Sequence, residues 1–260
     1  MTREKKSHEM EVAQAAAHEA GKILMDNYGK VSARFKPDRS IVTDADIKSE
    51  ETIKGILKKE FPDHSFLGEE SGIEDKGSEY TWVVDPLDGT TNYSIKNPFF
   101  NVSIALAKGG QSVLGVVYYP FQEELFYAET GKGAYLNDER IHVSNVSRIR
   151  DSFVSFCHGH DAQTVERMVP IFRRIKLLTE HLRQIGASAL ELSYVACGRT
   201  GCFFQLKMNP WDVAAGSLIV SEAGGKVTDI VGAPYTLKSR DLVASNGLLH
   251  EELLGLLRPA

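Results

Sequence analysis

The chain has 260 residues, of which 42% are hydrophobic and 25% charged, so it can build a sizeable core and is not an intrinsically disordered protein. Its formal net charge of −5 at pH 7 argues against a nucleic-acid-binding protein, because such proteins use a basic surface to displace counterions from phosphates. No apolar run is long enough to span a bilayer and the first residues lack the apolar core of a signal peptide, so we expect a cytoplasmic protein that does not bind a membrane.

The first quarter of the chain predicts two helices and a short strand. Apolar residues recur at helical spacing from Met10 to Tyr28, and Gly29 follows as a C-cap. A second helix begins at the segment TDAD, where Thr43 caps the helix and two acids suit its positive end, and it ends before Pro62. The segment HSFLGEE then predicts a short strand that ends in two glutamates.

Residues 80 to 136 have the pattern of a sheet, with apolar or β-branched runs (YTWVV, FFNVSIALA, SVLGVVYY, ELFYA and GAYL) separated by turn residues. We expect several of these strands to pair as antiparallel hairpins. Later residues predict short strands such as CFFQL that alternate with helices at 163–175, 187–198, 212–223 and 246–257. The fold class is therefore α/β, with an α+β half at 1–145 and an α/β half at 146–260, packed so closely that the two can count as one domain.

Three cysteines, Cys157, Cys197 and Cys202, follow neither a zinc-binding nor a disulfide spacing. Neither of the last two has a flanking histidine that could activate a nucleophilic thiol. We therefore expect reduced thiols that pack as apolar side chains.

The segment WVVDPLDGTTNY places two aspartates three residues apart at the end of a predicted strand. Gly89 lets the chain reverse closely enough for the carboxylates of Asp85 and Asp88 to face one point, an arrangement that suits Mg²⁺. A Pro-x-Asp-Gly turn with solvated acids explains the same motif equally well. The motif alone therefore leaves both interpretations open.

Other acids also have an ordinary and a functional interpretation. Glu69 and Glu70 follow a short strand, where ligand sites of α/β proteins tend to form, but they can also be a solvated charge pair. Asp212 can be a first-turn residue of its helix. Asp44 can be an ordinary acid at the positive end of the helix that Thr43 caps. Alternatively, it can act with a threonine hydroxyl as a relay that takes a proton from a metal-bound water.

Three motifs, GEE, WVVDPLDGTTNY and PWDVAAGSLIVSEAGG, occur together in this order, and with them the chain resembles the inositol monophosphatase family from about residue 10 to residue 250. These are magnesium-dependent, lithium-sensitive phosphatases related to fructose-1,6-bisphosphatases. The resemblance implies a layered αβαβα sandwich, two or three Mg²⁺ ions per active site, a small phosphate ester as substrate and, as in many members, a homodimer.

The resemblance also implies the ligands of two metal ions. The first would be held by Glu69, Asp85 and the backbone carbonyl of Leu87, and the second by Asp85, Asp88 and Asp212. Such ions would neutralise the phosphoryl oxygens, lower the pKa of a bound water and stabilise the leaving alkoxide.

The same resemblance implies catalytic and phosphate-binding residues. Thr90 would hydrogen-bond the attacking water with Asp44 behind it, and Glu69 would help to deprotonate that water. The backbone N–H groups of Gly89 to Thr91 would bind the phosphate, aided by the start of a helix at TTNY. We expect direct in-line hydrolysis without a phosphoenzyme.

Substrate preference stays open because inositol-hydrolysing members commonly have an acid where this chain has Gln205. Lys207, two residues on, can meet a second phosphate or can be an exposed strand-end lysine. Gly186, Ala187 and Ser188 either present backbone groups to the substrate or only begin a helix. The expected substrate contacts are Asp88, Gly89, Thr90, Thr91, Gly186, Ala187, Ser188, Gln205 and Asp212.

The main functional expectation is Mg²⁺-dependent hydrolysis of a cyclitol or sugar phosphate. The same chemistry on fructose 1,6-bisphosphate, histidinol phosphate or 3′-phosphoadenosine 5′-phosphate is an alternative, although nucleotide-hydrolysing members usually have a basic residue at Thr91. A regulatory protein that binds divalent ions without turnover is an alternative from another class.

Overall fold

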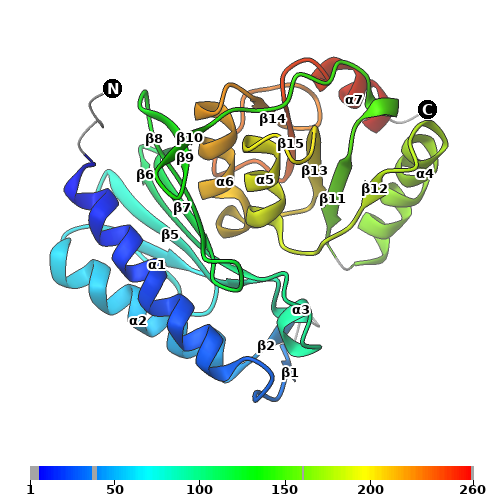
Figure 1. The fold of residues 1–260 in the computed structure, drawn as a ribbon. Coiled ribbons are helices and arrows are strands. Elements are labelled where there is room, and N and C mark those ends of the chain that lie inside the picture. The colour runs from blue at the N-terminus through cyan, green and yellow to red at the C-terminus, as the bar shows by residue number, and fades with distance from the viewer. Residues whose placement is uncertain (1–5, 37–39, 160, 259–260) are drawn as a thin grey trace.

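A computed structural model describes residues 6–36, 40–159 and 161–258, and its elements stack in five layers (Figure 1). Three layers are helical, and each consists mainly of one pair: α1 (His8–Asn27) with α2 (Asp44–Glu60), α5 (Ser188–Ala196) with α6 (Pro210–Glu222), and α4 (Ala162–Leu178) with α7 (His250–Leu257). An eight-stranded sheet separates the first two pairs, and a five-stranded sheet separates the second from the third. This confirms the predicted layered αβαβα sandwich.

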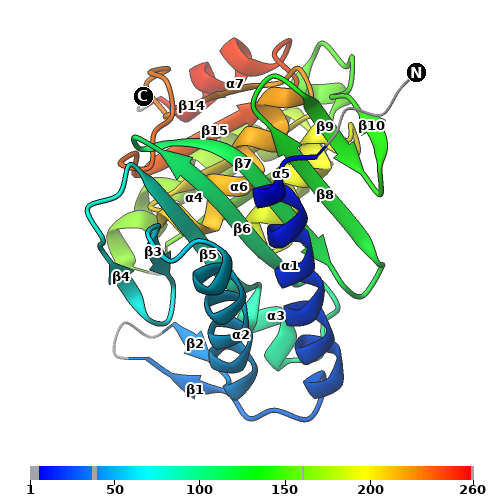
Figure 2. The ribbon, with the colours of Figure 1, turned by 90° about the vertical axis from the view of Figure 1, so that its left-hand side faces the viewer.

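The two N-terminal helices begin where their capping residues allow. The Ser7 hydroxyl accepts a hydrogen bond from the Met10 N–H at the start of α1. Thr43 caps α2 in a capping box, in which the carboxylate of Asp46 accepts the Thr43 N–H in return. Both helices match their predicted spans, and their buried faces cover one side of the eight-stranded sheet (Figure 2).

The larger sheet is antiparallel except between β3 and β5, which run parallel. In spatial order its strands are β10 (Glu139–Ile141), β9 (Gly133–Leu136), β8 (Glu124–Glu129), β7 (Gln111–Tyr119), β6 (Asn101–Lys108), β5 (Tyr80–Asp88), β3 (Ser65–Gly68) and β4 (Gly72–Glu74). The predicted hairpins between residues 80 and 136 are confirmed. α6 crosses the second face so closely that a Cβ at Gly115 would lie 2.7 Å from the Ala215 carbonyl oxygen.

The smaller sheet carries the alternation predicted for the second half of the chain. Its spatial order is β12 (Leu182–Arg183), β11 (Val154–His158), β13 (Cys202–Leu206), β15 (Asp241–Ser245) and β14 (Lys226–Thr228). β11 runs parallel to β12 and β13, and β15 runs antiparallel to its neighbours. Three short elements complete the fold: the hairpin of β1 (Arg34–Phe35) and β2 (Ile41–Val42), α3 (Thr90–Ser94) and the 3₁₀ turn η1 (Ile149–Asp151).

The strands divide near residue 145, but the core does not. The larger sheet ends at Ile141 and the smaller one begins at Val154, while α5 and α6 pack between them in one continuous apolar cluster. The division into domains at residue 145 therefore stays a prediction.

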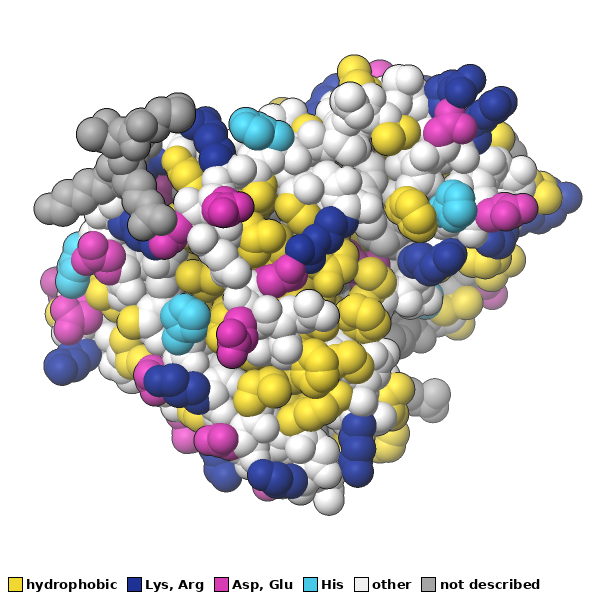
Figure 3. Space-filling view, viewed as in Figure 1, with side chains coloured by type: hydrophobic (Ala, Val, Ile, Leu, Met, Phe, Trp, Pro, Cys, Tyr) yellow, Lys and Arg dark blue, Asp and Glu magenta, His cyan; other side chains and the backbone are white. Residues whose placement is uncertain are grey.

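Two further expectations concern the cysteines and the membrane. Cys157, Cys197 and Cys202 are free thiols, as predicted, and two of them are fully buried. No helix in the described part of the chain is long and apolar enough to cross a membrane. Acidic and basic side chains are interspersed across the face of the molecule in Figure 3, so this face carries no basic field.

Candidate active site

A cavity of about 540 Å³ opens where the carboxyl end of β5, α3 and the starts of α5 and α6 meet the ends of β11 and β13. Four predicted metal ligands, Glu69, Asp85, Asp88 and Asp212, line it, and we call it the acid cavity. Leu87, Gly89, Thr90 and Thr91 line it too. Glu69 and Asp212, 143 positions apart in sequence, therefore meet at one place.

The segment from Asp85 to Gly89 is both a turn and a wall of the acid cavity. The β5–β6 register shifts between Asp85 and Asp88, and the Leu87 N–H donates to Asp85 Oδ1 at 3.0 Å. Gly89 caps α3 with a φ of +89°, and a Cβ there would lie 2.6 Å from the Phe99 carbonyl oxygen. Only glycine fits this reversal, after which Gly89, Thr90 and Thr91 line the cavity.

Asp88 connects the turn to α5. Its Oδ1 accepts the Ser188 N–H at 3.1 Å, and its Oδ2 accepts the Ala189 N–H at 2.8 Å and the Asn101 amide at 2.7 Å. These donors orient the carboxylate and reduce the cost of burying it. Asp88 therefore holds the start of α5 against the acid cavity.

Asp212 stands in the first turn of α6, as the sequence predicts. The Asn209 N–H donates to its Oδ2 at 2.8 Å, and the Gln205 amide lies 3.4 Å from the same oxygen. Pro210 occupies the first turn, where its missing N–H costs nothing. The ordinary first-turn role and the cavity position therefore coexist in one residue.

Glu69 lies on the turn after β3, and a second glutamate holds that turn. Buried Glu50 accepts the N–H groups of Glu70 and Ser71 at 2.8 and 2.7 Å. Lys36 donates to Glu69 at 3.1 Å and to Glu70 at 2.6 Å, and this pairing holds the pKa of its ammonium well above the ordinary range. Sequence analysis missed Lys36 because no spacing in ARFKPDRS marks it.

Burial raises the pKa of all four acids, and nearby carboxylates add to the shift for Glu69, Asp85 and Asp212. Burial, reinforced by neighbouring carboxylates, raises the pKa of Glu69 to about 7 and that of Asp212 to about 8. Burial and the charges of Glu69, Asp88 and Asp212 raise the pKa of Asp85 well above its usual range. A cavity with this surplus of negative charge and hard oxygen donors fits a divalent cation such as Mg²⁺.

The four acids are nevertheless not close enough together to coordinate one ion in this conformation. Across residues 6–36, 40–159 and 161–258, no group of three or more His, Cys, Asp or Glu side chains is arranged to hold a metal ion. Lys36 engages Glu69, and backbone N–H groups engage Asp88. A carboxylate has about four acceptor sites, so these bonds leave oxygen lone pairs for an ion.

The predicted partner of Thr90 is wrong by two residues. Thr90 Oγ1 lies 3.0 Å from Oδ1 of Asp46, which is 1% exposed, and 2.9 Å from the Leu87 carbonyl oxygen. Asp44 points to the surface and pairs with Arg34 at 2.6 Å. The capping box explains the difference, because it turns the third helical residue inward and leaves the first one outside. Burial raises the pKa of Asp46 to about 6.

All predicted substrate residues except Ala187 line the acid cavity. Gly186, Ser188 and Gln205 line it, whereas Ala187 is completely buried and does not. The N–H of Gly186 donates to Glu191 at 3.2 Å, so this N–H and that of Ser188 are already engaged. The burial of Ala187 and these engaged N–H groups favour the alternative interpretation, in which the three residues begin α5, and the substrate contacts stay a prediction.

Lys207 borders the acid cavity, but an acid is paired with it. Its ammonium lies 2.9 Å from Asp161 Oδ2, and its N–H donates to Asp241 Oδ1 at 2.9 Å. Asp161 also caps α4, and the N-cap pattern D-x-x-T was the signal that could have located it. The ion pair leaves Lys207 less positive charge for a second phosphate.

A buried glutamate, Glu191, supports the turn before α5 and was not predicted. It accepts the N–H groups of Ile185 and Gly186 at 3.3 and 3.2 Å and the thiol of Cys157 at 3.0 Å. Burial raises its pKa to about 8. Other cavity residues that the sequence did not indicate are Ser40, Ile41, His158, Gly159, Gln184 and Asn209.

Known proteins resemble this chain in both sequence and structure. The sequence model of the Inositol monophosphatase family matches residues 5–260. The "Fructose-1,6-bisphosphatase/inositol-1-monophosphatase" of Aquifex aeolicus is 38% identical over 94% of this chain and 93% of its own length. The "Nus factor SuhB" of Pasteurella multocida is 38% identical over 96% of both chains.

A solved structure agrees with these relatives. The extragenic suppressor protein suhB of Bartonella henselae superposes with a TM-score of 0.92 at 38% identity and covers 98% of this chain and 100% of its own. The resemblance seen in the motifs GEE, WVVDPLDGTTNY and PWDVAAGSLIVSEAGG therefore extends over the whole fold. The chain belongs to the inositol monophosphatase family and is a phosphoric monoester hydrolase of the inositol-phosphate phosphatase type.

Proposed function

We propose that this enzyme hydrolyses a small phosphate monoester of a cyclitol or sugar in the acid cavity, using two or three Mg²⁺ ions. The observation that carries the proposal is the meeting of Glu69, Asp85, Asp88 and Asp212 in one cavity beside the Thr90–Asp46 pair. When bound, Mg²⁺ would supply charge neutralisation at the phosphoryl oxygens, an acidified water and stabilisation of the leaving alkoxide. Glu69, Asp85 and the Leu87 carbonyl would hold one ion, and Asp85, Asp88 and Asp212 another.

Thr90 and Asp46 orient the attacking water in this proposal. When the Thr90 hydroxyl donates its proton to the Asp46 carboxylate, its lone pairs face the cavity and can accept a proton from water. Glu69, on the turn after β3, assists as a proton acceptor. The N–H groups of Gly89 to Thr91 at the start of α3 bind the phosphate oxygens.

Gln205 supports a hydroxyl-bearing substrate. It is 5% exposed, its Oε1 has no hydrogen-bond partner, and its Nε2 lies beside Asp212 Oδ2 at 3.4 Å. The carboxylate fixes the amide orientation, since the opposite one would place two oxygens together. This oxygen is therefore an unpaired acceptor at the wall of the acid cavity, and a donor such as a substrate hydroxyl could pair with it.

The Lys207–Asp161 pair favours a monophosphate over a bisphosphate. Among the described residues, Lys207 lines the acid cavity and Lys36 contacts its wall at Glu69, and both already pair with carboxylates. A second phosphate would have to displace Asp161 from Lys207. We also propose a homodimer, which the family resemblance implies, and a cytoplasmic location.

A panel of phosphate esters, measured with Mg²⁺ and with chelator, tests the proposal. Inositol 1-phosphate and sugar monophosphates should release phosphate only with Mg²⁺ and faster than fructose 1,6-bisphosphate, histidinol phosphate or 3′-phosphoadenosine 5′-phosphate. A bisphosphate or a nucleotide as best substrate would replace the substrate class and keep the reaction.

Two results would contradict the reaction itself. Absence of metal-dependent turnover on every ester would favour a regulatory protein that only binds divalent ions. In ¹⁸O-labelled water, a single inversion should place one solvent oxygen in phosphate, whereas a trapped phosphorylated residue would disprove direct hydrolysis.

A further inference from the structure

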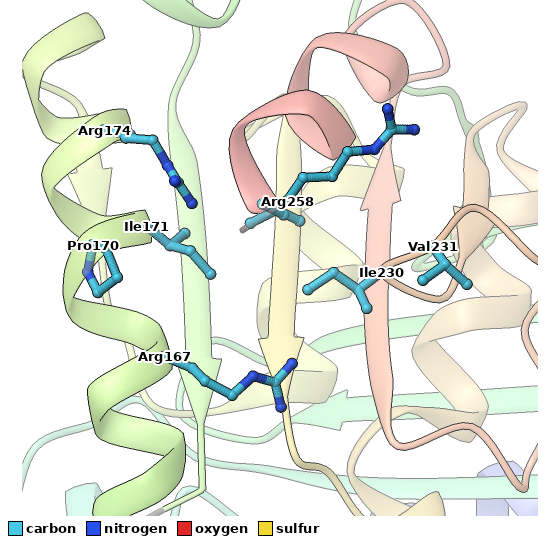
Figure 4. Close-up of a pocket in the computed structure, with 8 residues that line it drawn as sticks. Arg167, Pro170, Ile171, Arg174, Ile230, Val231 and Arg258 are labelled. Carbon is cyan, nitrogen blue, oxygen red and sulfur yellow. The ribbon is translucent and has the colours of Figure 1, made fainter. Parts of the chain in front are cut away.

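A second pocket, with a lining different from that of the acid cavity, lies between α4 and α7 in the outermost layer. Its volume is about 740 Å³, within the range typical of small-molecule sites. We call it the arginine groove; it is lined by Arg167, Pro170, Ile171, Arg174, Ile230, Val231, Leu257 and Arg258 (Figure 4). None of these residues lines the acid cavity.

The body of the arginine groove is apolar. Ile171 and Leu257 are almost completely buried at its base, at 4% and 2% exposure, while Val231 on the rim is 74% exposed. An exposed valine beside a concave apolar surface leaves hydrophobic area in water that a ligand could cover. The apolar walls therefore favour a ligand with a hydrocarbon body.

The polar groups at the groove are guanidinium groups. Figure 4 shows Arg167 and Arg174 extending from α4 toward the side formed by α7 and Ile230, with Arg258 at the end of α7. Arg167 pairs with Asp241 at 3.2 Å and Arg258 interacts electrostatically with Glu251, but no carboxylate in the described part of the chain forms an ion pair with Arg174. The groove therefore has unneutralised positive charge in a chain of net charge −5.

Arg174 also has a buried donor without a partner. Its Nε is buried and makes no hydrogen bond. A buried N–H left unpaired costs free energy, and in native proteins such groups usually meet water or a ligand. The planar guanidinium matches a carboxylate in geometry, and a monoanion loses less hydration on entering an apolar site than a phosphate dianion does.

We propose that the arginine groove binds a small amphipathic carboxylate, with its hydrocarbon body on Ile171, Leu257 and Val231 and its carboxylate on Arg174. Arg258 adds attraction at the rim. This site is independent of the acid cavity, so the proposal does not depend on which phosphate ester is hydrolysed.

The test is titration calorimetry of the full chain with decanoate, kept below its micelle concentration. We expect saturable binding of one decanoate per chain. Arg174→Met, which keeps an apolar stem of similar length, should weaken binding at least about tenfold, because a hydrogen bond to a charged group is lost. Arg173→Met is the matched control: Arg173 is an exposed neighbour on α4 outside the groove, so binding should not change.

Two further measurements keep the test decisive. Val231→Glu adds a negative charge on an exposed loop and should weaken decanoate binding even if the Arg174 variant folds poorly. Decyltrimethylammonium, with the same chain and opposite charge, should bind at least about tenfold more weakly than decanoate. The proposal is overturned by the absence of saturable binding, by equal losses in the Arg173 and Arg174 variants, by equal binding of the cationic amphiphile, or by association with micelles or vesicles alone.

Discussion

The acid cavity and the arginine groove show two ways in which one fold concentrates charge. The acid cavity gathers carboxylates from Glu69 to Asp212 at the ends of strands and helices, where the chain must turn. The arginine groove lies between two helices of the outer layer, and its charge comes from guanidinium groups. In the acid cavity, burial raises the pKa of the carboxyl groups. The charge of the acid cavity therefore depends on bound cations and protons.

Removing one central acid should have the largest effect on activity. We expect Asp85→Asn to lower kcat/KM about a thousandfold, because Asp85 is the one residue assigned to both metal ions and each ion contributes several kcal/mol to the transition state. The measurement is phosphate release over a range of Mg²⁺ concentrations. Glu74→Gln is the control, since Glu74 pairs with Lys54 and Lys58 at the surface. Equal activity of Asp85→Asn and wild type would disprove the metal assignment.

The corrected threonine partner gives the next largest effect and its own control. Thr90→Ala and Asp46→Asn should each lower kcat about a hundredfold, because positioned acid–base groups contribute on that order. Asp44→Asn should leave kcat unchanged, because Asp44 is exposed and pairs with Arg34 on the surface. A loss in the Asp44 variant that matches the loss in the Asp46 variant would restore the original assignment.

This pair of aspartates shows what the sequence could and could not provide. Element types and order follow from hydrophobic periodicity, so α1, α2 and the hairpins from β5 to β9 appear near their predicted bounds. Which of two nearby acids turns inward depends on a capping geometry that a motif match does not resolve, although the T-x-x-D pattern contained it.

Other site residues left no local signal. Lys36 meets Glu69 only because the β1–β2 hairpin brings it there, and Glu191 supports the turn at Gly186 from inside α5. The arginine groove likewise combines residues of α4, α7 and the segment around Ile230 that share no motif. Contacts between distant segments depend on packing, which one sequence does not reveal.

Gln205, which stands where inositol-hydrolysing members commonly have an acid, should affect KM more than kcat. We expect Gln205→Leu to raise KM for a cyclitol phosphate about tenfold, since it removes the unpaired acceptor at the cavity wall. p-Nitrophenyl phosphate, which has no hydroxyl group, is the control substrate, and its KM should stay the same. A parallel rise for both substrates would show that Gln205 acts through Asp212 and not through the substrate.

The smallest expected effect is a shift in the pH dependence of stability. The folded protein raises the pKa of Asp212 from 3.8 to about 8, so without metal it binds this proton more tightly than the unfolded chain does. The resulting stability is complete below pH 3.8 and is lost as the pH rises through about 8.

Asp212→Asn should therefore make the Tm in chelator fall less steeply between pH 4 and pH 8 than it does in wild type. One kcal/mol corresponds to about 2 to 4 °C in a protein of this size, so the difference is measurable. Mg²⁺ at pH 8 should raise the Tm of wild type more than that of the variant, because the cation relieves the charge that the substitution removes. Arg174→Met should leave the slope unchanged, since Arg174 lies outside the acid cavity. If the Tm of wild type and of Asp212→Asn depends equally on pH, ionisation of Asp212 does not destabilise the metal-free fold.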